Sequence, residues 1–449
     1  MSQVQTVISF VKTLLTLKNC VPMFRKFLIF ANLIALLTAC ALPFTQDKTV
    51  VNAMERYEEA YFRIVGKPDN WAEERDTTAS ALQRINARYV DEVDTEALVD
   101  EAIRGLEKKP DPDITATTRA MNAVMASLDK NSGYMSPQAY KRYQENLDGR
   151  FVGFGFRIEM RGDELTVVTP LKGSSAEKAG ILPDDVITHL NGEALKGYSF
   201  PEAISKLRGP EGSHAVLTIK RAGVETPIKL GLERRAVELE VVDYKVDGDV
   251  GYIRIHSFNR KTIDAVDDAL DHFDRRLGSR LCGIILDMRN NPGGLVTAAV
   301  DVADQFLEDG NIFSAINRGK SFSEEDADSG DRIGGRPIMV MLNKGSASAA
   351  EIVAGALQNQ NRARIFGQQS YGKGTMQTLY DLDNGGGLRL TTGRFTAGGG
   401  VSFNGIGLTP DIPDTSIEGE NDLAPVARAG NALACTLSVQ TAAAANAQQ

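Results

Sequence analysis

Residues 337–360 read PIMVMLNKGSASAAEIVAGALQNQ. The run PIMVMLN is almost wholly apolar, which is typical of a strand buried on both faces of a parallel sheet. In SAAEIVAGALQNQ the apolar residues recur at helical spacing, and Ser348 with Glu351 has the S-x-x-E pattern of a capping box. The stretch therefore predicts a buried strand, a loop and a helix, which is the repeating unit of an α/β fold.

The same alternation continues on both sides of this stretch, so we expect a βα core over residues 234–415. Further strands are predicted at VGYIRI, LCGIILDM and RARIFG, and further helices at TIDAVDDALDHFDRRL and LVTAAVDVADQFL. Residues 318–335, RGKSFSEEDADSGDRIGG, lack such a pattern and are expected to form a polar loop, a candidate lid. The later TMQTLYDLDNGGGLRLTTGRF predicts a strand, a turn and a strand.

Regions of different character flank this core. Residues 40–149 carry segments with apolar residues at i, i+3 and i+4, which predict an N-terminal helical region. Residues 150–233 contain short β-type runs with two short helices between them, so a separate β domain is expected. Residues 416–449 end in QTAAAANAQQ, and we expect a C-terminal helix followed by a disordered tail. A chain of 449 residues is long enough for two or three such domains.

The charge and the few histidines and cysteines argue against several classes of function. The net charge is −9 and no long basic run occurs, so nucleic-acid binding is not expected. The four histidines are scattered and the four cysteines lack C-x-x-C spacing, so no metal site and no cofactor are predicted. Cys282 lies in an apolar strand pattern, and we expect a buried thiol rather than half of a disulfide.

Residues 1–39 have the features of an export signal. From Met23 the sequence MFRKFLIFANLIALLTAC has a positive start and an apolar segment too short for a comfortable transmembrane span, so Met23 is a candidate true start. Leu37–Cys40 resembles the lipobox of bacterial lipoproteins, which implies cleavage before Cys40 and a lipid on its sulfur. An ordinary signal peptide with a chance cysteine is the alternative.

Two stretches that directly follow buried strands frame a candidate site. They are DMRNNPGG at residues 287–294 and GSASAAE at residues 345–351. Sites of α/β folds gather where strands end and helix N-termini meet, and amides at a helix N-terminus can stabilise an oxyanion. Both stretches also have a purely structural explanation, because Ser348 can serve as a helix cap and Pro-Gly-Gly as a tight turn.

The stretch GQQSYGKGTMQ, residues 367–377, nearly matches a phosphate-binding loop. In that motif Ser or Thr follows the lysine at once, and a helix comes next. Here Gly374 follows Lys373 and a strand pattern comes next, so nucleotide binding is not expected. Lys373 is then either a surface lysine in a glycine turn or a base. A Ser-His-Asp site would need a histidine such as His256 in GYIRIHSF, for which an ordinary strand residue is the favoured interpretation.

The β domain resembles a PDZ domain in the circularly permuted form of bacterial proteases. The resemblance rests on Gly153–Phe156, which are similar to the carboxylate-binding loop of that family, and on SSAEKAGILPDDVITHLNGE and KLRGPEG further along. In such a loop the backbone N–H groups of Gly153, Phe154, Gly155 and Phe156 would bind a terminal carboxylate while the peptide adds as a strand. A plain glycine-rich hairpin is the alternative.

The order of these pieces resembles the carboxyl-terminal processing protease family, which are S41 serine peptidases with a PDZ domain and a Ser–Lys dyad. The resemblance covers roughly residues 80–415 and includes YVDEVDTEALVDEAIRG, SLDKNSGYMSP and GIGLTPDI. It implies an α/β multi-domain chain with a protease core of the ClpP/crotonase type. The chain departs from the family at residues 107–123, an insertion-like stretch, and at Phe395–Gly400, where the family has a tyrosine-to-proline stretch.

Carried over residue by residue, the resemblance assigns Ser348 as the nucleophile, Lys373 as its base and Gln377 as the side chain that orients the lysine. It places the oxyanion hole at backbone amides near Gly293, Gly294 and Ala349. A serine hydroxyl needs an adjacent base, and a lysine can serve only when neutral. Burial can lower the lysine pKa from its usual value of about 10.4 by several units, which would make Lys373 competent.

The function implied by the resemblance is a periplasm-facing, lipid-anchored serine endopeptidase of the bacterial envelope. Its substrates would be proteins with accessible C-terminal tails, and tail binding to the PDZ domain would shift the enzyme toward an active form. A helical-repeat adaptor lipoprotein and a homo-oligomer are candidate partners, and Ala41 after Cys40 favours the outer membrane. The alternatives are a non-catalytic PDZ scaffold and a Ser–Lys hydrolase of a non-protein acyl substrate.

Overall fold

A computed structural model describes residues 48–449 except 112–113, 329, 417–423 and 434–449. The predicted signal, the lipobox with Cys40 and most of the predicted tail therefore lie outside the described residues. The chain divides into two compact units, Met1–Asn52 and Ala53–Gln449. All elements that build the candidate site belong to the second unit.

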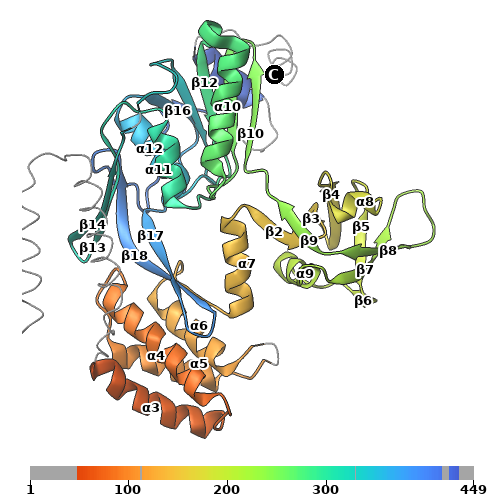
Figure 1. The fold of residues 1–449 in the computed structure, drawn as a ribbon, viewed down its shortest axis with the longest axis vertical. Helices are drawn as coiled ribbons and strands as arrows, with labels where there is room; N and C mark the ends of the chain where they lie inside the picture. Colours follow the sequence, from red (N-terminus) through yellow and green to blue (C-terminus); the bar gives the residue numbers. More distant parts are fainter. Residues whose placement is uncertain (1–47, 112–113, 329, 417–423, 434–449) are drawn as a thin grey trace, which may run out of the picture. The chain divides into compact units, whose positions relative to one another are not determined.

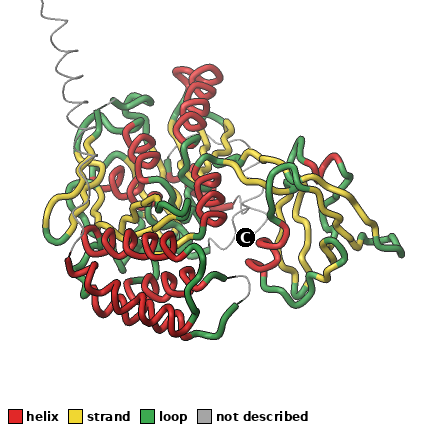
Figure 2. The backbone as a smooth tube through the Cα atoms, turned by 60° about the horizontal axis from the view of Figure 1, so that its bottom comes forward, coloured by secondary structure: helices red, strands yellow, loops and turns green. Residues whose placement is uncertain are grey.

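The N-terminal region is helical, as predicted, but it also contributes one strand to the core. Its elements are α3 (Lys48–Ile64), α4 (Trp71–Arg88), α5 (Thr95–Glu107), α6 (Ala116–Leu128), β1 (Gly133–Met135) and α7 (Pro137–Leu147). The longer helices lie side by side (Figure 2), and α6 packs closely on Gly105 of α5, where an added Cβ would lie 2.5 Å from the carbonyl oxygen of Arg119. Trp71 packs against the rings of Tyr57 and Tyr61.

The next region is the expected β domain with two short helices. Its elements are β2 (Arg150–Gly153), β3 (Phe156–Arg161), β4 (Glu164–Pro170), α8 (Ser175–Lys178), β5 (Val186–Leu190), β6 (Glu193–Ala194), α9 (Phe200–Leu207), β7 (His214–Lys220), β8 (Ile228–Glu233) and β9 (Arg235–Glu238). Strands β3-β4-β5-β7-β8 form one antiparallel sheet with β6 on β5. Because β2 and β9 pair antiparallel, the chain enters and leaves this domain along one two-stranded ribbon.

The core is built on a six-stranded sheet in the order β10-β11-β12-β15-β16-β19, which is parallel except for β10. Its strands are β10 (Val242–Asp247), β11 (Val250–Ile255), β12 (Gly283–Asp287), β15 (Ile338–Leu342), β16 (Ala363–Gly367) and β19 (Ile412–Pro413). The helices are α10 (Thr262–Leu277), the short 3₁₀ helix η1 (Gly278–Arg280), α11 (Val296–Asp304), α12 (Ala349–Asn359) and α13 (Ala424–Ala432). The helix predicted after residue 416 is α13.

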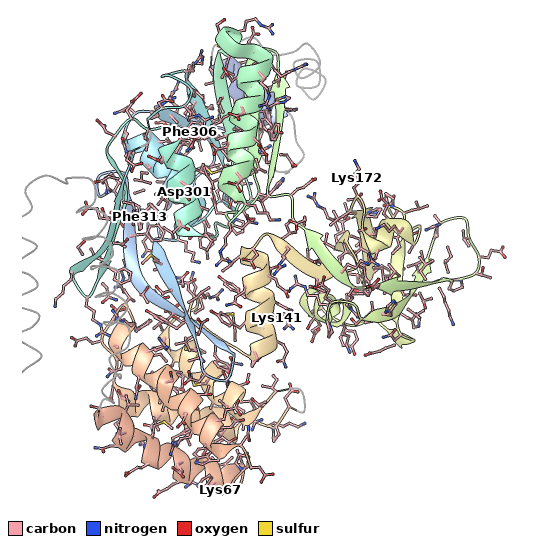
Figure 3. The ribbon with its side chains drawn as sticks, viewed as in Figure 1. Lys67, Lys141, Lys172, Asp301, Phe306 and Phe313 are labelled. Atoms are coloured by element: carbon pink, nitrogen blue, oxygen red, sulfur yellow. The ribbon has the colours of Figure 1, made fainter. Side chains whose placement is uncertain are left out.

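Helices cover both faces of this sheet, which explains why its central strands are continuously apolar. Ile284 and Leu286 of β12 pack with α10, α11 and α12, whereas Ile285 between them packs with residues of α13 on the other face. Helices α11 and α12 lie next to each other (Figure 1). Phe306 and Phe313, labelled in Figure 3, are buried in the larger of the two cores.

A second sheet has the order β1-β18-β13-β14, with β17 also paired to β18. Its strands besides β1 are β13 (Asn311–Asn317), β14 (Lys320–Asp326), β17 (Thr375–Asp381) and β18 (Gly387–Ala397). The predicted strand, turn and strand after residue 375 are β17 and β18. The prediction of a loop over residues 318–335 was wrong for β14, which pairs with β13 as an exposed edge strand. An edge strand with few apolar residues leaves no buried face to detect in the sequence.

The prediction that Cys282 is a free buried thiol was also wrong, because Cys282 is disulfide-bonded. It is the only cysteine among the described residues, so its partner lies outside them. Cys282 is only partly buried and packs against the cluster that holds α13 on the sheet. The apolar run around Cys282 indicated burial correctly for the strand but carried no information about a cysteine distant in the sequence.

Candidate active site

Residues 337–360 form a strand, a loop and a helix, with Ser348 at the junction of the loop and the helix. Strand β15 ends at Leu342 and α12 begins at Ala349, so Ser348 is the residue that caps the helix. Its backbone has φ 57° and ψ −115°, a conformation that residues other than glycine rarely adopt. Strained residues of this kind cluster at functional sites, where the surrounding structure must hold them in place.

Glu351, three residues further on, holds Ser348 in place. Its Oε2 accepts a hydrogen bond from the amide of Ser348 at 2.7 Å, which is the glutamate half of the predicted capping box. The amide of Glu351 donates to the carbonyl oxygen of Ser348 at 2.8 Å. The Ser348 hydroxyl, which faces the same amide in the capping box, therefore has at most a secondary share of that donor.

The same carboxylate also holds the loop that carries Lys373. Oε2 of Glu351 accepts the amide of Lys373 at 2.9 Å, while Oε1 accepts the Ser370 hydroxyl at 2.5 Å and the Gly372 amide at 2.6 Å. Glu351 is completely buried. These three bonds, together with the bond from the Ser348 amide, replace the hydration of its carboxylate. The amides of Ser348 and Lys373 thus share one oxygen atom as their acceptor, which fixes the two loops relative to each other.

Lys373 lies in an environment that disfavours its charged form. Burial is the largest cause that lowers the pKa of Lys373 below its usual value, and the positive charge of Arg389 is the next. Lys130 lowers the pKa further, whereas Asp129 and Glu351 raise it. No hydrogen bond or ion pair of its ammonium group is found among the described residues. Lys373 is therefore not the surface lysine of a glycine turn.

Gln377, the predicted partner of the lysine, lies on β17 but does not bind Lys373 in this structure. Its Nε2 donates to the carbonyl oxygen of Thr375 at 3.2 Å, to Oγ1 of Thr375 at 3.1 Å and to Oγ1 of Thr391 at 3.3 Å. With Nε2 held in this way, the carbonyl oxygen of Gln377 has no donor in the described part of the chain. It remains available to accept a hydrogen bond from an ammonium group.

The glycines after β12 lie directly against Ser348. A Cβ added to Gly293 would lie 2.8 Å from Cβ of Ser348 and 2.9 Å from the amide nitrogen of Ala349, so only glycine fits there. The amide of Gly293 already donates to Oδ1 of Asn291 at 2.8 Å. The amides of Gly294 and Ala349 have no acceptor within the residues described. Of the three predicted oxyanion amides, these two are unengaged.

A buried ionic cluster at the end of β12 supports this glycine loop. Asp287, at the end of β12, accepts hydrogen bonds from the Tyr252 hydroxyl at 2.8 Å, from Nη1 of Arg254 at 3.1 Å and from Nη2 of Arg289 at 2.6 Å. Asp287 also accepts the amide of Arg289 at 3.0 Å, which closes the turn. Separating one partner from this buried network would leave an uncompensated charge, which is strongly unfavourable. The cluster therefore holds the start of the loop in place.

The loops after β12 and β15 are also tied directly to each other. Oδ1 of Asn343 accepts the amide of Asn290 at 2.8 Å, and Nδ2 of Asn343 donates to Oδ1 of Asn290 at 2.9 Å. The amide of Ala347 donates to the carbonyl oxygen of Asn291 at 2.9 Å. The two stretches that were predicted to frame a site therefore form a single structure.

His256, the alternative base, has other partners. Its Nε2 lies 2.7 Å from Oδ2 of Asp243, and Nε of Arg254 lies 3.4 Å from its Nδ1. It is Lys373, not His256, that shares an anchoring carboxylate with Ser348. The geometry favours Ser348 with Lys373 over a Ser-His-Asp arrangement.

The sequence did not single out the residues that connect the site. The sequence pattern marks Glu351 only as the end of a capping box, and it gives no role to Asp129, in the turn after α6, or to Arg389, on β18. An S-x-x-E pattern is a signal for a helix start, but the other three donors to Glu351 come from residues 370–373 and could not be inferred from spacing. Contacts made by a distant turn leave no local pattern in a single sequence.

The predicted tail-binding loop lines a large cavity. The cavity measures about 1160 Å³, and its lining includes Gly153–Phe156 and the helix residues Phe200, Ile204 and Leu207. Gly155 has φ 81°, and a Cβ there would collide with Ser174. A glycine is therefore required at this position, and the adjoining backbone can approach a ligand closely.

Two features are absent from the part of the chain that the structure describes. No group of three or more histidine, cysteine, aspartate or glutamate side chains is placed to hold a metal ion there. No helix of the described segments is both long enough and apolar enough to span a membrane.

Comparison with known families identifies two parts of the chain. A model of peptidase family S41 matches residues 249–414, and a model of the PDZ domain matches residues 166–221. The S41 match includes Ser348 and Lys373, whereas the PDZ match begins after the loop at residues 153–156. The fold and the matches define a class of protein, the serine peptidases that carry a PDZ domain.

Curated relatives narrow this class to a family. The chain is 38% identical over 333 residues to a carboxy-terminal-processing protease of Bartonella bacilliformis, an alignment that covers 74% of this chain and 73% of that protein. It is 35% identical over 309 residues to a CtpA-like serine protease of Staphylococcus aureus, covering 68% of this chain and 61% of the relative. The chain therefore belongs to the S41 family of carboxy-terminal-processing serine proteases, as the sequence predicted.

Solved structures agree with this fold. The photosystem II D1 C-terminal processing protease matches with a TM-score of 0.51 and 27% identity, over 80% of this chain and 97% of that one. An S41 protease from Bacteroides fragilis matches with a TM-score of 0.50 over 85% of this chain and 96% of that one. At 17% identity the second likeness shows the fold alone.

Proposed function

We propose that this protein is an endopeptidase that binds the C-terminal tails of envelope proteins on its PDZ domain and cleaves them with Ser348 and Lys373. The observation that carries the proposal is the shared acceptor, because Glu351 binds the amides of both residues through one carboxylate oxygen. A structural cap alone would need only the first of these bonds. The second bond brings the lysine loop to the start of the helix that carries the serine.

In the proposed reaction the hydroxyl of Ser348 attacks the carbonyl carbon of the scissile peptide bond. Neutral Lys373 takes the hydroxyl proton as the carbon–oxygen bond forms, and the resulting ammonium gives a proton to the leaving amine as the carbon–nitrogen bond breaks. Water then attacks the acyl-enzyme with Lys373 again as the base. The burial that lowers the pKa of Lys373 favours the neutral form that the first step needs.

Backbone amides would stabilise the oxyanion that forms in each attack. The amides of Gly294 and Ala349 are the best candidates because they are unengaged, whereas the Gly293 amide would first have to leave Asn291. Gln377 would act when Lys373 is charged, since its carbonyl oxygen can accept from the ammonium without adding a charge. Gly293 then contributes mainly by its lack of a side chain next to Ser348.

Tail capture is assigned to the PDZ domain. The cavity beside Gly153–Phe156 has an apolar wall on α9 and a strand edge at β3, which suits an extended peptide that adds as a strand. The amides of the glycine loop would bind the terminal carboxylate of such a tail. A protein with an accessible, extended C-terminus is therefore the proposed substrate class, and a helical-repeat adaptor lipoprotein is a proposed partner.

We place the enzyme in the periplasm, lipid-anchored at Cys40, with the outer membrane favoured over the inner. The disulfide of Cys282 supports an exported location, because disulfides persist in oxidising compartments. Labelling cells with a radioactive fatty acid tests the anchor: the protein takes up label, and a Cys40→Ser variant does not. Label retained by Cys40→Ser would overturn this assignment.

The catalytic proposal is tested with the full-length chain, purified in detergent, and a folded protein that carries a disordered apolar C-terminal tail. Cleavage read by mass spectrometry is expected for the wild type and for Ser323→Ala, a control on the exposed strand β14. It is expected to be lost in Ser348→Ala and in Lys373→Ala, with circular dichroism unchanged. Cleavage that survives in either variant would refute the dyad. Tail binding without cleavage by the wild type would instead favour a scaffold.

A further inference from the structure

The turn that follows α6 reaches the lysine loop. Asp129 shapes this turn: its Oδ1 accepts the amides of Asn131 at 2.6 Å and Ser132 at 2.8 Å, and its Oδ2 accepts the Ser132 hydroxyl at 2.8 Å. The side chain of Asn131 then donates to Oγ1 of Thr375, two residues after Lys373, at 3.3 Å. A segment of the N-terminal region is thereby fixed beside the proposed base.

The same turn fixes the position of Arg389. The carbonyl oxygen of Asn131 accepts a hydrogen bond from Nε of Arg389 at 2.9 Å. Gly133, next in the chain after the turn, pairs with Arg389 in the register of β1 and β18, and Leu379 of β17 pairs with it on the other side. Arg389 therefore projects from the central strand of this part of the sheet with its guanidinium held by the turn.

Arg389 has no carboxylate partner. Among the described residues it forms no ion pair, although it is half-buried, and its one hydrogen bond goes to a neutral carbonyl. Arg254 and Arg289, by contrast, both form ion pairs with Asp287. An uncompensated guanidinium that is partly removed from water is unfavourable, so its charge acts on whatever ionisable group lies nearby.

We propose that Arg389 is a positioning residue: the Asp129 turn, which bonds both Arg389 and the lysine loop through Asn131, holds its guanidinium where the positive charge favours a neutral Lys373, and the Asp129 carboxylate partly offsets that charge. The inference rests on the proposed role of Lys373 as the base. Arg389 would not touch the substrate. It would set the fraction of enzyme molecules in which Lys373 can take the proton of Ser348.

The charges that face Lys373 come from three elements. Arg389 lies on β18, Asp129 and Lys130 lie in the turn after α6, and Glu351 lies on α12. After burial, Arg389 is the largest influence that lowers the pKa of Lys373, with Lys130 adding to it, and Asp129 and Glu351 act in the opposite direction. Exchanging Arg389 or Asp129 for a neutral residue should therefore move the pKa of Lys373 in opposite directions.

The direction in which each variant shifts the pH profile follows from the need for a neutral Lys373. In Arg389→Met the pKa of Lys373 rises, so the acidic limb of kcat/KM against pH moves to higher pH. In Asp129→Asn, whose Oδ1 can still accept the two amides, the limb moves down. Arg389→Lys keeps the charge and is expected to restore the wild-type limb in large part.

The experiment measures kcat and KM from pH 5 to 10 for the full-length enzyme and these variants, with Arg364→Met as the control. Arg364 is exposed on β16, so its exchange alters the net charge equally without altering the surroundings of Lys373. A readout independent of catalysis is the ¹³Cε signal of Lys373, titrated by NMR in the Ser348→Ala background. The signal is assigned by its absence from Lys373→Met.

Opposite shifts for Arg389→Met and Asp129→Asn, in both the rate profile and the NMR titration, would support the inference. Unchanged limbs, or a raised KM with an unchanged pH profile, would refute it and indicate a substrate-binding role for Arg389. If Arg389→Met does not fold, the downward shift in Asp129→Asn decides alone. Failure of the proposed function can be distinguished from failure of this inference. It would appear as a wild-type enzyme that does not cleave, or as cleavage by Ser348→Ala.

Discussion

Exchange of Glu351 for glutamine tests the central link of the site. Glutamine has the shape of glutamate but only one acceptor oxygen, and its amide nitrogen is a donor. In the wild type, Oε2 binds the amides of Ser348 and Lys373, and Oε1 binds the Ser370 hydroxyl and the Gly372 amide. Whichever orientation the glutamine adopts, one pair of donors will face an NH₂ group.

The two orientations differ in cost. With NH₂ at the Oε2 position, two buried amides lose their acceptor. With NH₂ at the Oε1 position, the Ser370 hydroxyl can turn and accept, although it already accepts the amide of Leu408 at 2.7 Å, and only the Gly372 amide is left unpaired. The second orientation is therefore preferred. Losing one charge-assisted bond and leaving one buried N–H unpaired is expected to cost about 3 kcal/mol.

The assay is urea unfolding of the full-length protein, combined with the rate of tail cleavage at neutral pH. A loss of about 3 kcal/mol is a large share of the 5 to 15 kcal/mol that stabilises a typical domain. We also expect kcat to fall at least about tenfold, because the lysine loop loses one of its anchors next to the Lys373 amide. Glu324→Gln, on the exposed strand β14, is the matched control and should change neither quantity.

The reasoning would be refuted by a Glu351→Gln variant that unfolds within about 1 kcal/mol of the wild type and cleaves at the wild-type rate. That result would show that the two loops are held together without the carboxylate. A variant that is destabilised but fully active would separate the two roles. Glu351 would then support the fold without positioning Lys373.

Three further predictions concern the strain, the space and the charge at the site. Because Ser348 has φ 57°, Ser348→Gly should be more stable than Ser348→Ala by about 1 kcal/mol in urea unfolding, and equal stability would argue against strain there. Gly293→Ala should abolish cleavage because its Cβ would lie 2.8 Å from that of Ser348, whereas Gly231→Ala, with open space around it, should cleave normally. A lowered pKa of Lys373 means that the unfolded chain binds this proton more tightly, so stability rises with pH from the folded pKa toward 10.5. Lys373→Met should therefore be more stable than the wild type at pH 7, with an advantage that shrinks as the pH approaches 10.5; an advantage that grows with pH would contradict the lowered pKa.

Much of the fold could be predicted because its central strands are buried on both faces. Continuous apolar runs at β12 and β15, each followed by a helical pattern, indicate a parallel sheet without any knowledge of tertiary contacts. Strand β14 was not predicted because it is a polar edge strand, and the disulfide of Cys282 was not predicted because its partner is distant in the sequence. Both misses involve structure that the local pattern of apolar residues does not encode.

The residues of the site likewise divide into those that a local sequence pattern predicts and those that it does not. The strand ends that carry Gly293 and Ser348 were predicted from their position after buried strands, and the structure brings them into contact. Lys373 was assigned through a family resemblance, because nothing in its glycine-rich surroundings distinguishes a base from a surface residue. The influence of Asp129 and Arg389 on Lys373 depends on three-dimensional proximity across a sheet, which spacing in the sequence does not reveal.

The two explanations of Ser348, a helix cap and a nucleophile, turn out not to exclude each other. In this capping box the glutamate makes the stronger half, and its bond to the backbone of Ser348 does not consume the hydroxyl. The cap also holds Ser348 in a backbone conformation that it would otherwise avoid, and it extends through the same oxygen to Lys373. A motif that ordinarily begins a helix can therefore also align a serine with its base, provided that the glutamate is buried and its second oxygen is met by donors from another loop.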